Sequence, residues 1–181
     1  MAQQFPELTE GLTRFIEEQH IFFTGTAAPE GTVNVSPKGT DSFRVLSPGR
    51  VAWQSLTGSG NETAAHLLKS NRVTVMFCAF TRKPLILRLY GKASAIHPRD
   101  ADWQEMEALF PKHTGTRQFF VMDIELVQTS CGYAVPFMDY AGERGGLDAW
   151  TENKGKEGIE AYWKEHNQLS IDGFETDILA E

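Results

Sequence analysis

The spacing of apolar residues along the chain changes near residue 20. Before that point Leu8, Leu12, Phe15 and Ile16 recur at helical spacing, with charged residues on the opposite face, so the pattern predicts an amphipathic helix over residues 7–19. Beyond it, short runs of β-branched and aromatic residues alternate with polar ones, which is typical of strands. The turn signals between the first of these runs are Pro29-Glu30-Gly31, Pro37-Lys38-Gly39 and Ser47-Pro48-Gly49.

The whole pattern predicts a mainly β protein with peripheral helices, arranged as an antiparallel barrel of six or seven strands that is closed or partly closed. The expected strands lie in 21–25, 33–35, 43–45, 51–53, 73–80, 84–95 and 119–127. The expected helices cover 63–69 and 99–110, and one or two more follow residue 140, interrupted by Gly155 and Gly158. We expect a barrel domain over residues 1–139 and a C-terminal helical extension over 140–181.

The charge balance argues against polyanionic partners. The chain has 181 residues, with 17 Lys and Arg against 24 Asp and Glu, which gives a formal charge of −7. A protein that grips nucleic acid or an anionic membrane gains affinity from clustered basic residues, and here they are scattered. We therefore expect neither partner. The absence of a signal-like start and of a long apolar run predicts a cytoplasmic protein.

The two cysteines, Cys78 and Cys131, stand 53 positions apart in apolar surroundings. A structural zinc site needs four converging thiolates or imidazoles, and no such spacing occurs. We expect both residues to be buried, reduced thiols.

The most informative segment for chemistry is a glycine-rich turn, Thr57-Gly58-Ser59-Gly60-Asn61-Glu62-Thr63, between an expected strand and an expected helix. Backbone N–H groups at a helix start, with hydroxyls beside them, form an anion site. The same letters also fit a capping box from Ser59 to Glu62, which needs no ligand. The sequence leaves both interpretations open.

Two basic residues stand out near or within expected strands. Lys38 ends a strand one hairpin before Trp53, so antiparallel neighbours could bring it beside the glycine-rich turn; it could equally be a solvated turn lysine. Arg88 interrupts an apolar strand and points away from Leu87 and Leu89. It should either pair with a carboxylate or reach a ligand or a subunit interface.

The usual catalytic motifs are missing. The five histidines have no partners at metal-ligand spacing, and the sequence contains no HExxH, GxSxG, Walker A lysine motif or strand-linked GxGxxG. An enzyme with this sequence would depend on a cofactor for its reactivity.

An ordered series of motifs over roughly residues 15–130 resembles the pyridoxamine 5′-phosphate oxidase-like family, the FMN-binding split β-barrels. The series comprises Thr32–Ser36 with Lys38 after it, Trp53–Ser55, the turn 57–63 leading into His66-Leu67, Asn71–Phe77, Arg88–Ala93 and the strand near 119–128.

The resemblance implies a homodimer that holds FMN at the subunit interface and acts as an oxidoreductase on a small molecule. The catalytic residues are not indicated. The positions that match the family's cofactor-binding motifs are Ser36, Lys38, Ser55, Thr57, Gly58, Ser59, Asn61, Thr63 and, nearest the dimer cleft, Arg88.

Two departures from the family pattern argue against pyridoxamine phosphate as the substrate. Basic residues usually begin the helix where this chain has Asn61-Glu62-Thr63, and the C-terminal Arg-Leu-x-Pro segment is missing. The alternative function is a non-catalytic protein that binds flavin, haem or a deazaflavin, such as a stress protein. Trp150 and Trp163 could stack near a flavin or anchor the C-terminal tail to the barrel.

Overall fold

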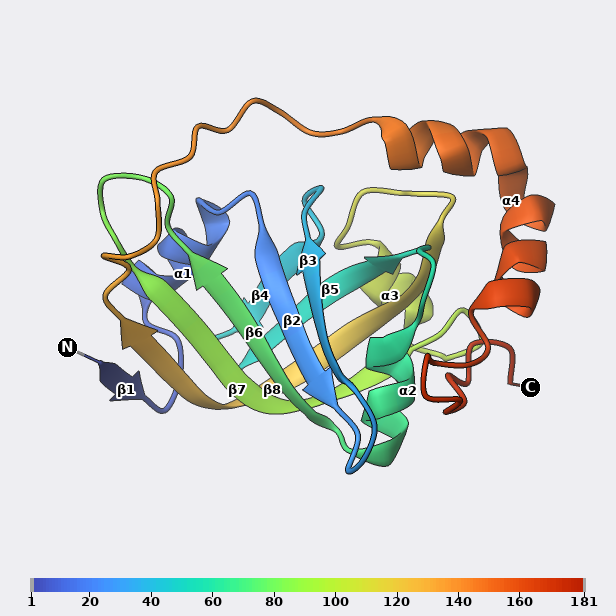
Figure 1. The fold of residues 1–181 in the computed structure, drawn as a ribbon, viewed down its shortest axis with the longest axis horizontal. Coiled ribbons are helices and arrows are strands. Elements are labelled where there is room, and N and C mark those ends of the chain that lie inside the picture. The colour runs from blue at the N-terminus through green and yellow to red at the C-terminus, as the bar shows by residue number, and fades with distance from the viewer. Residues whose placement is uncertain (1, 181) are drawn as a thin grey trace.

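The computed structural model describes residues 2–180, and its framework is one antiparallel sheet of eight strands (Figure 1). Seven strands follow the order β3-β2-β6-β7-β8-β5-β4, and β1 pairs with β8. The strands are β1 Gln3–Phe5, β2 Phe22–Ala27, β3 Val33–Lys38, β4 Phe43–Ser47, β5 Arg50–Leu56, β6 Arg72–Cys78, β7 Ile86–Ile96 and β8 Thr116–Ser130. The helices are α1 Glu10–Glu17, α2 Glu62–Lys69, α3 Trp103–Glu107 and α4 Gly146–His166.

The sheet curls into a barrel that stays open between β3 and β4, its two edge strands. The long strands β7 and β8, of 11 and 15 residues, form its centre and share the most extensive ladder. The expected mainly β, antiparallel architecture with a C-terminal helix is confirmed. The expected strand count matches the seven-strand path, and β1 is an addition that the sequence pattern did not indicate.

Alternation along the strands gives the barrel its apolar interior. Leu87 and Leu89 are fully buried, whereas Arg88 between them faces outward and is half-buried. Trp53 and Phe120 meet inside at a ring-centroid distance of 5.3 Å. Each large apolar side chain buried in this way contributes roughly 1.5–3 kcal/mol to folding.

The helices agree with the expected pattern; α1 and α3 are shorter than expected, and α2 begins one residue earlier. α1 begins after Thr9, whose hydroxyl accepts a hydrogen bond from the N–H of Leu12 at 3.3 Å. The interruption expected in the C-terminal helix is found at Gly155, which has φ 63° and ψ 177° and divides α4 into two pieces. Gly158 causes no break, because only a left-handed or extended residue interrupts the helical hydrogen bonds.

Residues 131–145 cross the top of the barrel in Figure 1 without helix or strand and lead into α4. Cys131 is exposed at the start of this crossing, so the expectation that both cysteines are buried is wrong for Cys131 and right for Cys78. After α4 the chain turns back beside α2 (Figure 1). Among residues 2–180, none of the helices is both long and apolar enough to span a bilayer.

Candidate functional site

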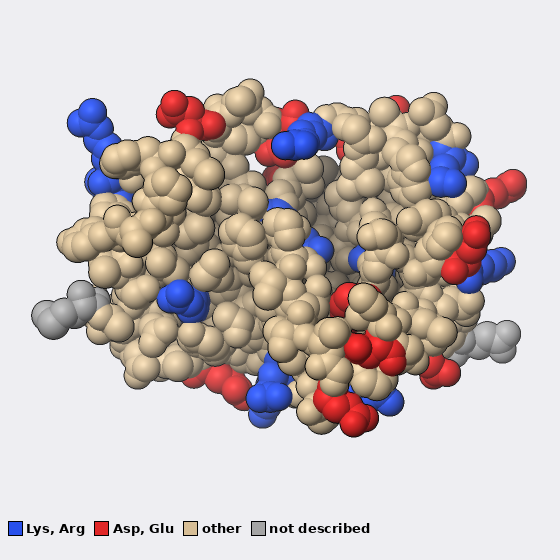
Figure 2. Space-filling view, viewed as in Figure 1, with Lys and Arg blue, Asp and Glu red and all other residues tan. Residues whose placement is uncertain are grey.

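A cleft of about 710 Å³ opens between the edge strand β3 and the loop that joins β5 to α2. Figure 2 shows it as a hollow in the middle of the face, with Lys and Arg atoms inside. The volume lies within the roughly 300–1,000 Å³ typical of small-molecule and cofactor sites. The polar residues on its walls include Asn34, Ser36, Lys38, Ser42, Gln54, Ser55, Thr57, Ser59, Glu62, Thr63 and Arg117.

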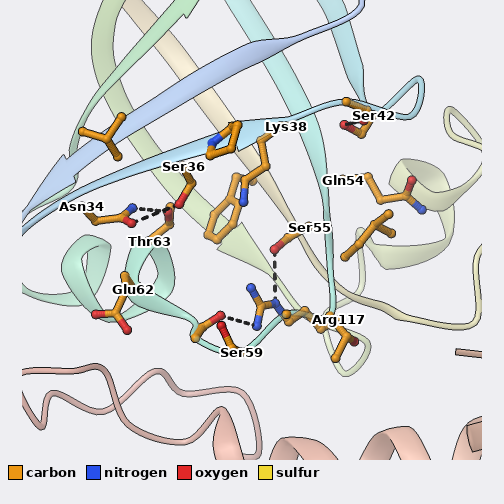
Figure 3. Close-up of a pocket in the computed structure, with 18 of the residues that line it drawn as sticks. Asn34, Ser36, Lys38, Ser42, Gln54, Ser55, Ser59, Glu62, Thr63 and Arg117 are labelled. Carbon is orange, nitrogen blue, oxygen red and sulfur yellow. Dashed lines mark hydrogen bonds between the residues drawn. The ribbon is translucent and has the colours of Figure 1, made fainter. Parts of the chain in front are cut away.

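Lys38 reaches this cleft by a route other than strand pairing. One of the two interpretations that the sequence left open had its strand next to the strand of Trp53. In the structure β3 pairs with β2 at one edge of the sheet, while β5 lies near the other edge, between β4 and β8. The curl of the sheet, rather than strand pairing, brings Lys38 opposite the glycine-rich turn. Figure 3 shows the Lys38 side chain extending from β3 toward Ser55 and Arg117.

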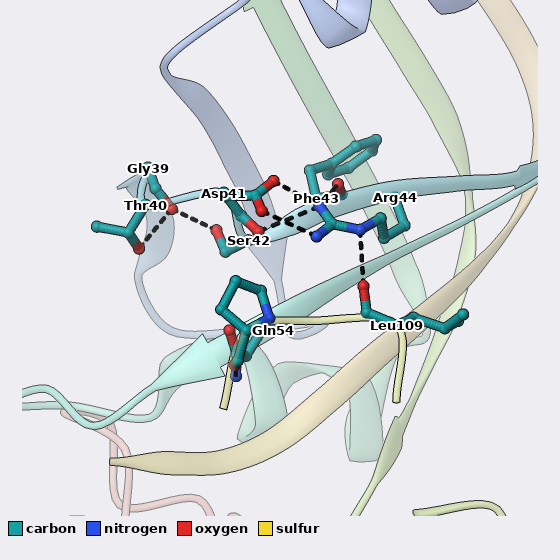
Figure 4. Close-up of polar contacts among 9 residues, drawn as sticks. Gly39, Thr40, Asp41, Ser42, Phe43, Arg44, Gln54 and Leu109 are labelled. Carbon is teal, nitrogen blue, oxygen red and sulfur yellow. Dashed lines mark hydrogen bonds and ion pairs between the residues drawn. The ribbon is translucent and has the colours of Figure 1, made fainter. Parts of the chain in front are cut away.

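The turn after β3 has a strained backbone that a local ion pair fixes. Thr40 and Asp41 both adopt left-handed conformations, with φ of 60° and 51°, which non-glycine residues rarely adopt. The guanidinium of Arg44 donates to both carboxylate oxygens of Asp41, at 2.7 and 3.0 Å, and to the carbonyl of Leu109 at 2.8 Å (Figure 4). These bonds hold the end of β3, and therefore Lys38, in one position.

Lys38 is half-buried and has no counter-charge beside it. In the described chain no carboxylate lies within ion-pair distance of its Nζ. Burial, reinforced by repulsion from Arg117, lowers the pKa of Lys38 to about 8. A partly buried ammonium with a lowered pKa favours an anion beside it, because an anion restores the charged form.

Arg117, at the start of β8, is the second cation of the cleft and is only 5% exposed. Its guanidinium donates to the hydroxyl of Ser55 at 3.3 Å, the carbonyl of Gly60 at 2.8 Å and Oδ1 of Asn167 at 3.0 Å (Figure 3 shows the first two). Burial lowers the pKa of Arg117 to about 10, against the opposing influence of Tyr162 and Glu62, so it stays charged at neutral pH. All three acceptors are neutral, so Arg117 has no carboxylate among its hydrogen-bond partners.

The glycine-rich turn divides into structural and open positions. Thr57 donates its hydroxyl to the carbonyl of Gly115 at 2.7 Å, and the buried amide of Asn61 pairs with Gln118 at 2.7 and 3.3 Å. These two side chains therefore hold the loop in place. The hydroxyl of Ser59 lines the cleft and has no partner among the hydrogen bonds of residues 2–180.

The start of α2 also faces the cleft. The capping-box interpretation is wrong, because Asn61 rather than Ser59 occupies the N-cap position and makes no side-chain cap. The carboxylate of Glu62 instead accepts the N–H of Ile171 at 3.1 Å, so it turns toward the C-terminal tail. The first N–H groups of the helix thus remain available to an anion.

A polar cluster occupies the other end of the cleft. The amide of Asn34 donates to the hydroxyl of Thr63 at 3.3 Å and accepts from that of Ser36 at 3.0 Å (Figure 3). Because Ser36 gives its proton to Asn34, its oxygen can only accept a hydrogen bond from a ligand. Asn34 belongs to this cluster although the sequence pattern did not single it out.

The structure leaves Arg88 outside the cleft. Its guanidinium lies on the outer face of β7 and donates to the hydroxyl of Ser130 at 3.2 Å, and it forms no ion pair within residues 2–180. Neither tryptophan of α4 lines the cleft. Trp163 anchors the tail by donating its Nε1–H to the hydroxyl of Thr57 at 2.9 Å, and Trp150 packs edge-on against Tyr162.

Arg117 is the main residue that sequence reasoning missed. The expected strand began at residue 119, so Arg117 fell in a connection. The available signal was the polar pair Arg117-Gln118 between Gly115 and the apolar run from Phe119. In the structure β8 begins at Thr116, and the register places Gln118 opposite Ser55.

Comparison with known proteins identifies the family. The family model described as pyridoxamine 5′-phosphate oxidase matches residues 8–131. The chain belongs to the pyridoxamine 5′-phosphate oxidase family. A relative from Aspergillus flavus, the pyridoxamine 5′-phosphate oxidase family protein ustO, is 35% identical over 190 aligned positions, which cover 93% of this chain and 75% of that protein.

Solved structures support the same fold at low sequence identity. HupZ from Group A Streptococcus is 16% identical and superposes with a TM-score of 0.53, covering 66% of this chain and 91% of its own. A protein from Clostridium acetobutylicum, related to general stress protein 26 of B. subtilis and to the pyridoxinephosphate oxidase family, is 15% identical with a TM-score of 0.52, covering 67% and 86%. The chain therefore has the same fold as these proteins.

Proposed function

We propose that this protein binds FMN in the cleft, with the phosphate between Lys38, Arg117 and the loop 57–60. The observation that carries the proposal is a pair of cations, the buried Arg117 and the half-buried Lys38, which face one cleft and have no carboxylate partner within ion-pair distance in the described chain. Two positive charges in one cleft repel each other, and a bound dianion relieves that repulsion. The loop residues Gly58 and Ser59 line the cleft and add neutral groups at the same end.

The other end of the cleft suits a polar ring edge. Ser36, Asn34 and Thr63 line it, and the apolar residues Phe120, Leu147 and Ile171 also belong to the lining of the cleft. Hydrogen-bonding groups beside apolar surface fit a heteroaromatic ring that carries carbonyl and N–H groups, as the isoalloxazine does. Ser36, Lys38, Ser55, Gly58, Ser59 and Thr63 are thus proposed ligands, with Thr57 and Asn61 as supports.

We propose a homodimer in which a second copy covers the open side of the cleft. Val33 and Val35 are 73% and 66% exposed on the edge strand β3, directly beside the site. An unpaired edge strand with exposed apolar residues is a surface that proteins normally cover.

The proposed activity is that of an oxidoreductase acting on a small organic substrate other than pyridoxamine phosphate. FMN, when bound, supplies a ring that accepts and returns a hydride. The chain binds and orients that ring. A substrate phosphate would need a further cationic site, and the basic residues lining this cleft in the described chain are Lys38 and Arg117, both assigned here to the cofactor.

A non-catalytic flavin-binding role is the second candidate, and one observation favours it. Among the described residues that line the cleft, Glu62 is the one carboxylate and it is engaged by the N–H of Ile171. No other side chain there suits proton transfer near neutral pH except Lys38. Haem is less favoured than flavin, because that lining contains no His, Cys, Met or Tyr to ligate iron.

The test is titration of the purified protein with FMN and with riboflavin, which differs from FMN by lacking the phosphate. We expect FMN to bind at least tenfold more tightly. Equal affinities would overturn the phosphate assignment, and no binding of either would overturn the function. Reduction of the bound flavin by NADH or NADPH would support the oxidoreductase, whereas a flavin that binds but is never reduced would support the second candidate.

A further inference from the structure

The C-terminal tail contributes one side chain to the interior of the site region. Asn167 follows α4 and is fully buried. Residues 146–166 form a largely exposed helix on the surface, so a buried polar residue directly after it requires an explanation. Buried amides are costly unless their hydrogen bonds are made.

Both ends of the Asn167 amide bind parts of the proposed phosphate site. Its Oδ1 accepts from Nη1 of Arg117 at 3.0 Å, and its Nδ2 donates to the carbonyl of Gly58 at 3.0 Å. One side chain therefore links the cation to the glycine-rich turn across separations of 50 and 109 residues in sequence. This link fixes the guanidinium relative to the loop.

The backbone of Asn167 is itself held. Its carbonyl accepts the hydroxyl of Thr176 at 2.6 Å, and its N–H donates to the carbonyl of Trp163 at 3.0 Å. Together with the contacts of Trp163 to Thr57 and of Ile171 to Glu62, the tail binds three points of the segment 57–62.

The neutrality of Asn167 matters for the charge of the site. A carboxylate in its place would form an ion pair with Arg117 and cancel the charge that an anion needs. An amide orients the guanidinium equally well but leaves that charge uncompensated. The same holds for the other acceptors of Arg117, the hydroxyl of Ser55 and the carbonyl of Gly60.

We propose that Asn167 is a positioning residue that aims Arg117 at a ligand phosphate and preserves its charge, which makes the C-terminal tail an integral part of the anion site. The proposal rests on the proposed function, because it assumes that the ligand carries a phosphate. It assigns Asn167 to the phosphate rather than to the flavin ring or to general stability.

The experiment compares dissociation constants for FMN and riboflavin in the chain of 181 residues. Asn167→Ala should weaken FMN binding roughly tenfold, the loss expected for an interaction that orients a charged donor, with riboflavin changed less than about twofold. Asn167→Asp, nearly identical in shape, should weaken FMN binding further, by roughly 30-fold or more, because it neutralises Arg117. Asn153 lies exposed on α4, so Asn153→Ala and Asn153→Asp are matched controls and should bind both ligands as the parent does.

A more conservative variant keeps the test informative if the Asn167 variants fail to fold. Thr176→Val keeps the shape of a residue that is 1% exposed and removes the hydroxyl that holds Asn167. It should reduce FMN affinity by a factor of about two to three with riboflavin unchanged.

Parallel losses for FMN and riboflavin in the Asn167 variants would show a merely structural role, and FMN binding as tight in Asn167→Asp as in Asn167→Ala would overturn the charge argument. If the parent protein itself fails to prefer FMN, the proposed function has failed before the variants are compared. If the parent prefers FMN and all variants retain the preference, this inference alone has failed.

Discussion

Two arginines on adjacent strands of the same sheet have opposite surroundings. Arg88 on β7 interrupts an apolar run, lies on the outer face and makes one hydrogen bond, to Ser130. Arg117 at the start of β8 is nearly inaccessible, makes three hydrogen bonds to neutral acceptors and faces the cleft. Arg88, which stands out more in the sequence because it interrupts an apolar strand, therefore lies outside the cleft, whereas Arg117 lines it.

The difference between Arg88 and Arg117 shows how burial affects the ability of a charged side chain to bind an anion. An exposed guanidinium is well solvated and contributes little to binding an anion. A buried one has already lost its water, so an anion that replaces the water is bound strongly. Neutral hydrogen-bond acceptors fix the orientation of the Arg117 guanidinium, whereas the half-buried Arg88 remains partly hydrated.

The largest expected effect is that of Arg117→Met. Loss of a buried, charge-assisted contact should cost about 2–3 kcal/mol, or roughly 30- to 150-fold in FMN affinity. Riboflavin titration and the melting temperature provide the controls, because Gly60, Ser55 and Asn167 lose their donor and the fold should be less stable. A variant that keeps the parent's preference for FMN over riboflavin would contradict the assignment.

Lys38→Met should follow, with FMN affinity reduced roughly 10- to 30-fold. Because the half-buried ammonium is partly desolvated and repelled by Arg117, the same change should raise the melting temperature of the flavin-free protein. Calorimetry of the flavin-free variant measures this directly. A lower melting temperature for Lys38→Met than for the parent would mean that Lys38 stabilises the fold, and would contradict its assignment as an unpaired cation that binds a ligand.

The pH dependence of FMN binding sharpens the same point. The pKa of Lys38 is lowered to about 8, so the ammonium is present below that pH and is lost above it. Arg117, with a pKa of about 10, stays charged over this interval. We expect FMN affinity to fall between about pH 8 and pH 9.5 by several-fold, and Lys38→Met to remove most of that decline. A parent protein with a flat profile would contradict the placement of Lys38 beside the phosphate.

Arg44→Met tests the turn that holds β3. Without the bonds to Asp41 and Leu109, the strained residues Thr40 and Asp41 should relax, and Lys38 should lose its fixed position. We expect a two- to fivefold loss of FMN affinity, on the scale of one hydrogen bond. Titration of FMN against Arg44→Met and Arg14→Met, an exposed arginine on α1, separates this effect from a loss of surface charge.

Arg88→Met should have the smallest effect, with FMN affinity within about twofold and stability within about 1 kcal/mol of the parent. Isothermal titration and chemical denaturation measure the two quantities. A loss as large as that of Arg117→Met would remove the contrast and indicate that Arg88 reaches a ligand across a subunit interface.

The sequence by itself determined most of the architecture, because local patterns report local structure. Alternation predicted the strands, the spacing of Leu8, Leu12 and Phe15 predicted α1, and Gly155 marked the break in α4. For Lys38 the sequence left two interpretations open, a solvated turn lysine or a position beside the turn 57–63; the structure has the second, but through the curl of the sheet rather than through adjacent strands. The motif series indicated the family, which the comparisons confirm.

Tertiary structure alone decided which polar groups are free to act. The curl of the sheet, not strand pairing, joins Lys38 to the glycine-rich turn, and the return of the tail places Asn167 against Arg117. Thr57 and Asn61 are residue types that often bind ligands, but here their side chains form hydrogen bonds within the protein, to Gly115 and Gln118. The sequence shows which side chains can donate or accept hydrogen bonds. Whether a charge or a hydroxyl remains available to a ligand depends on its burial and its hydrogen-bond partners, and both are set by residues far away along the chain.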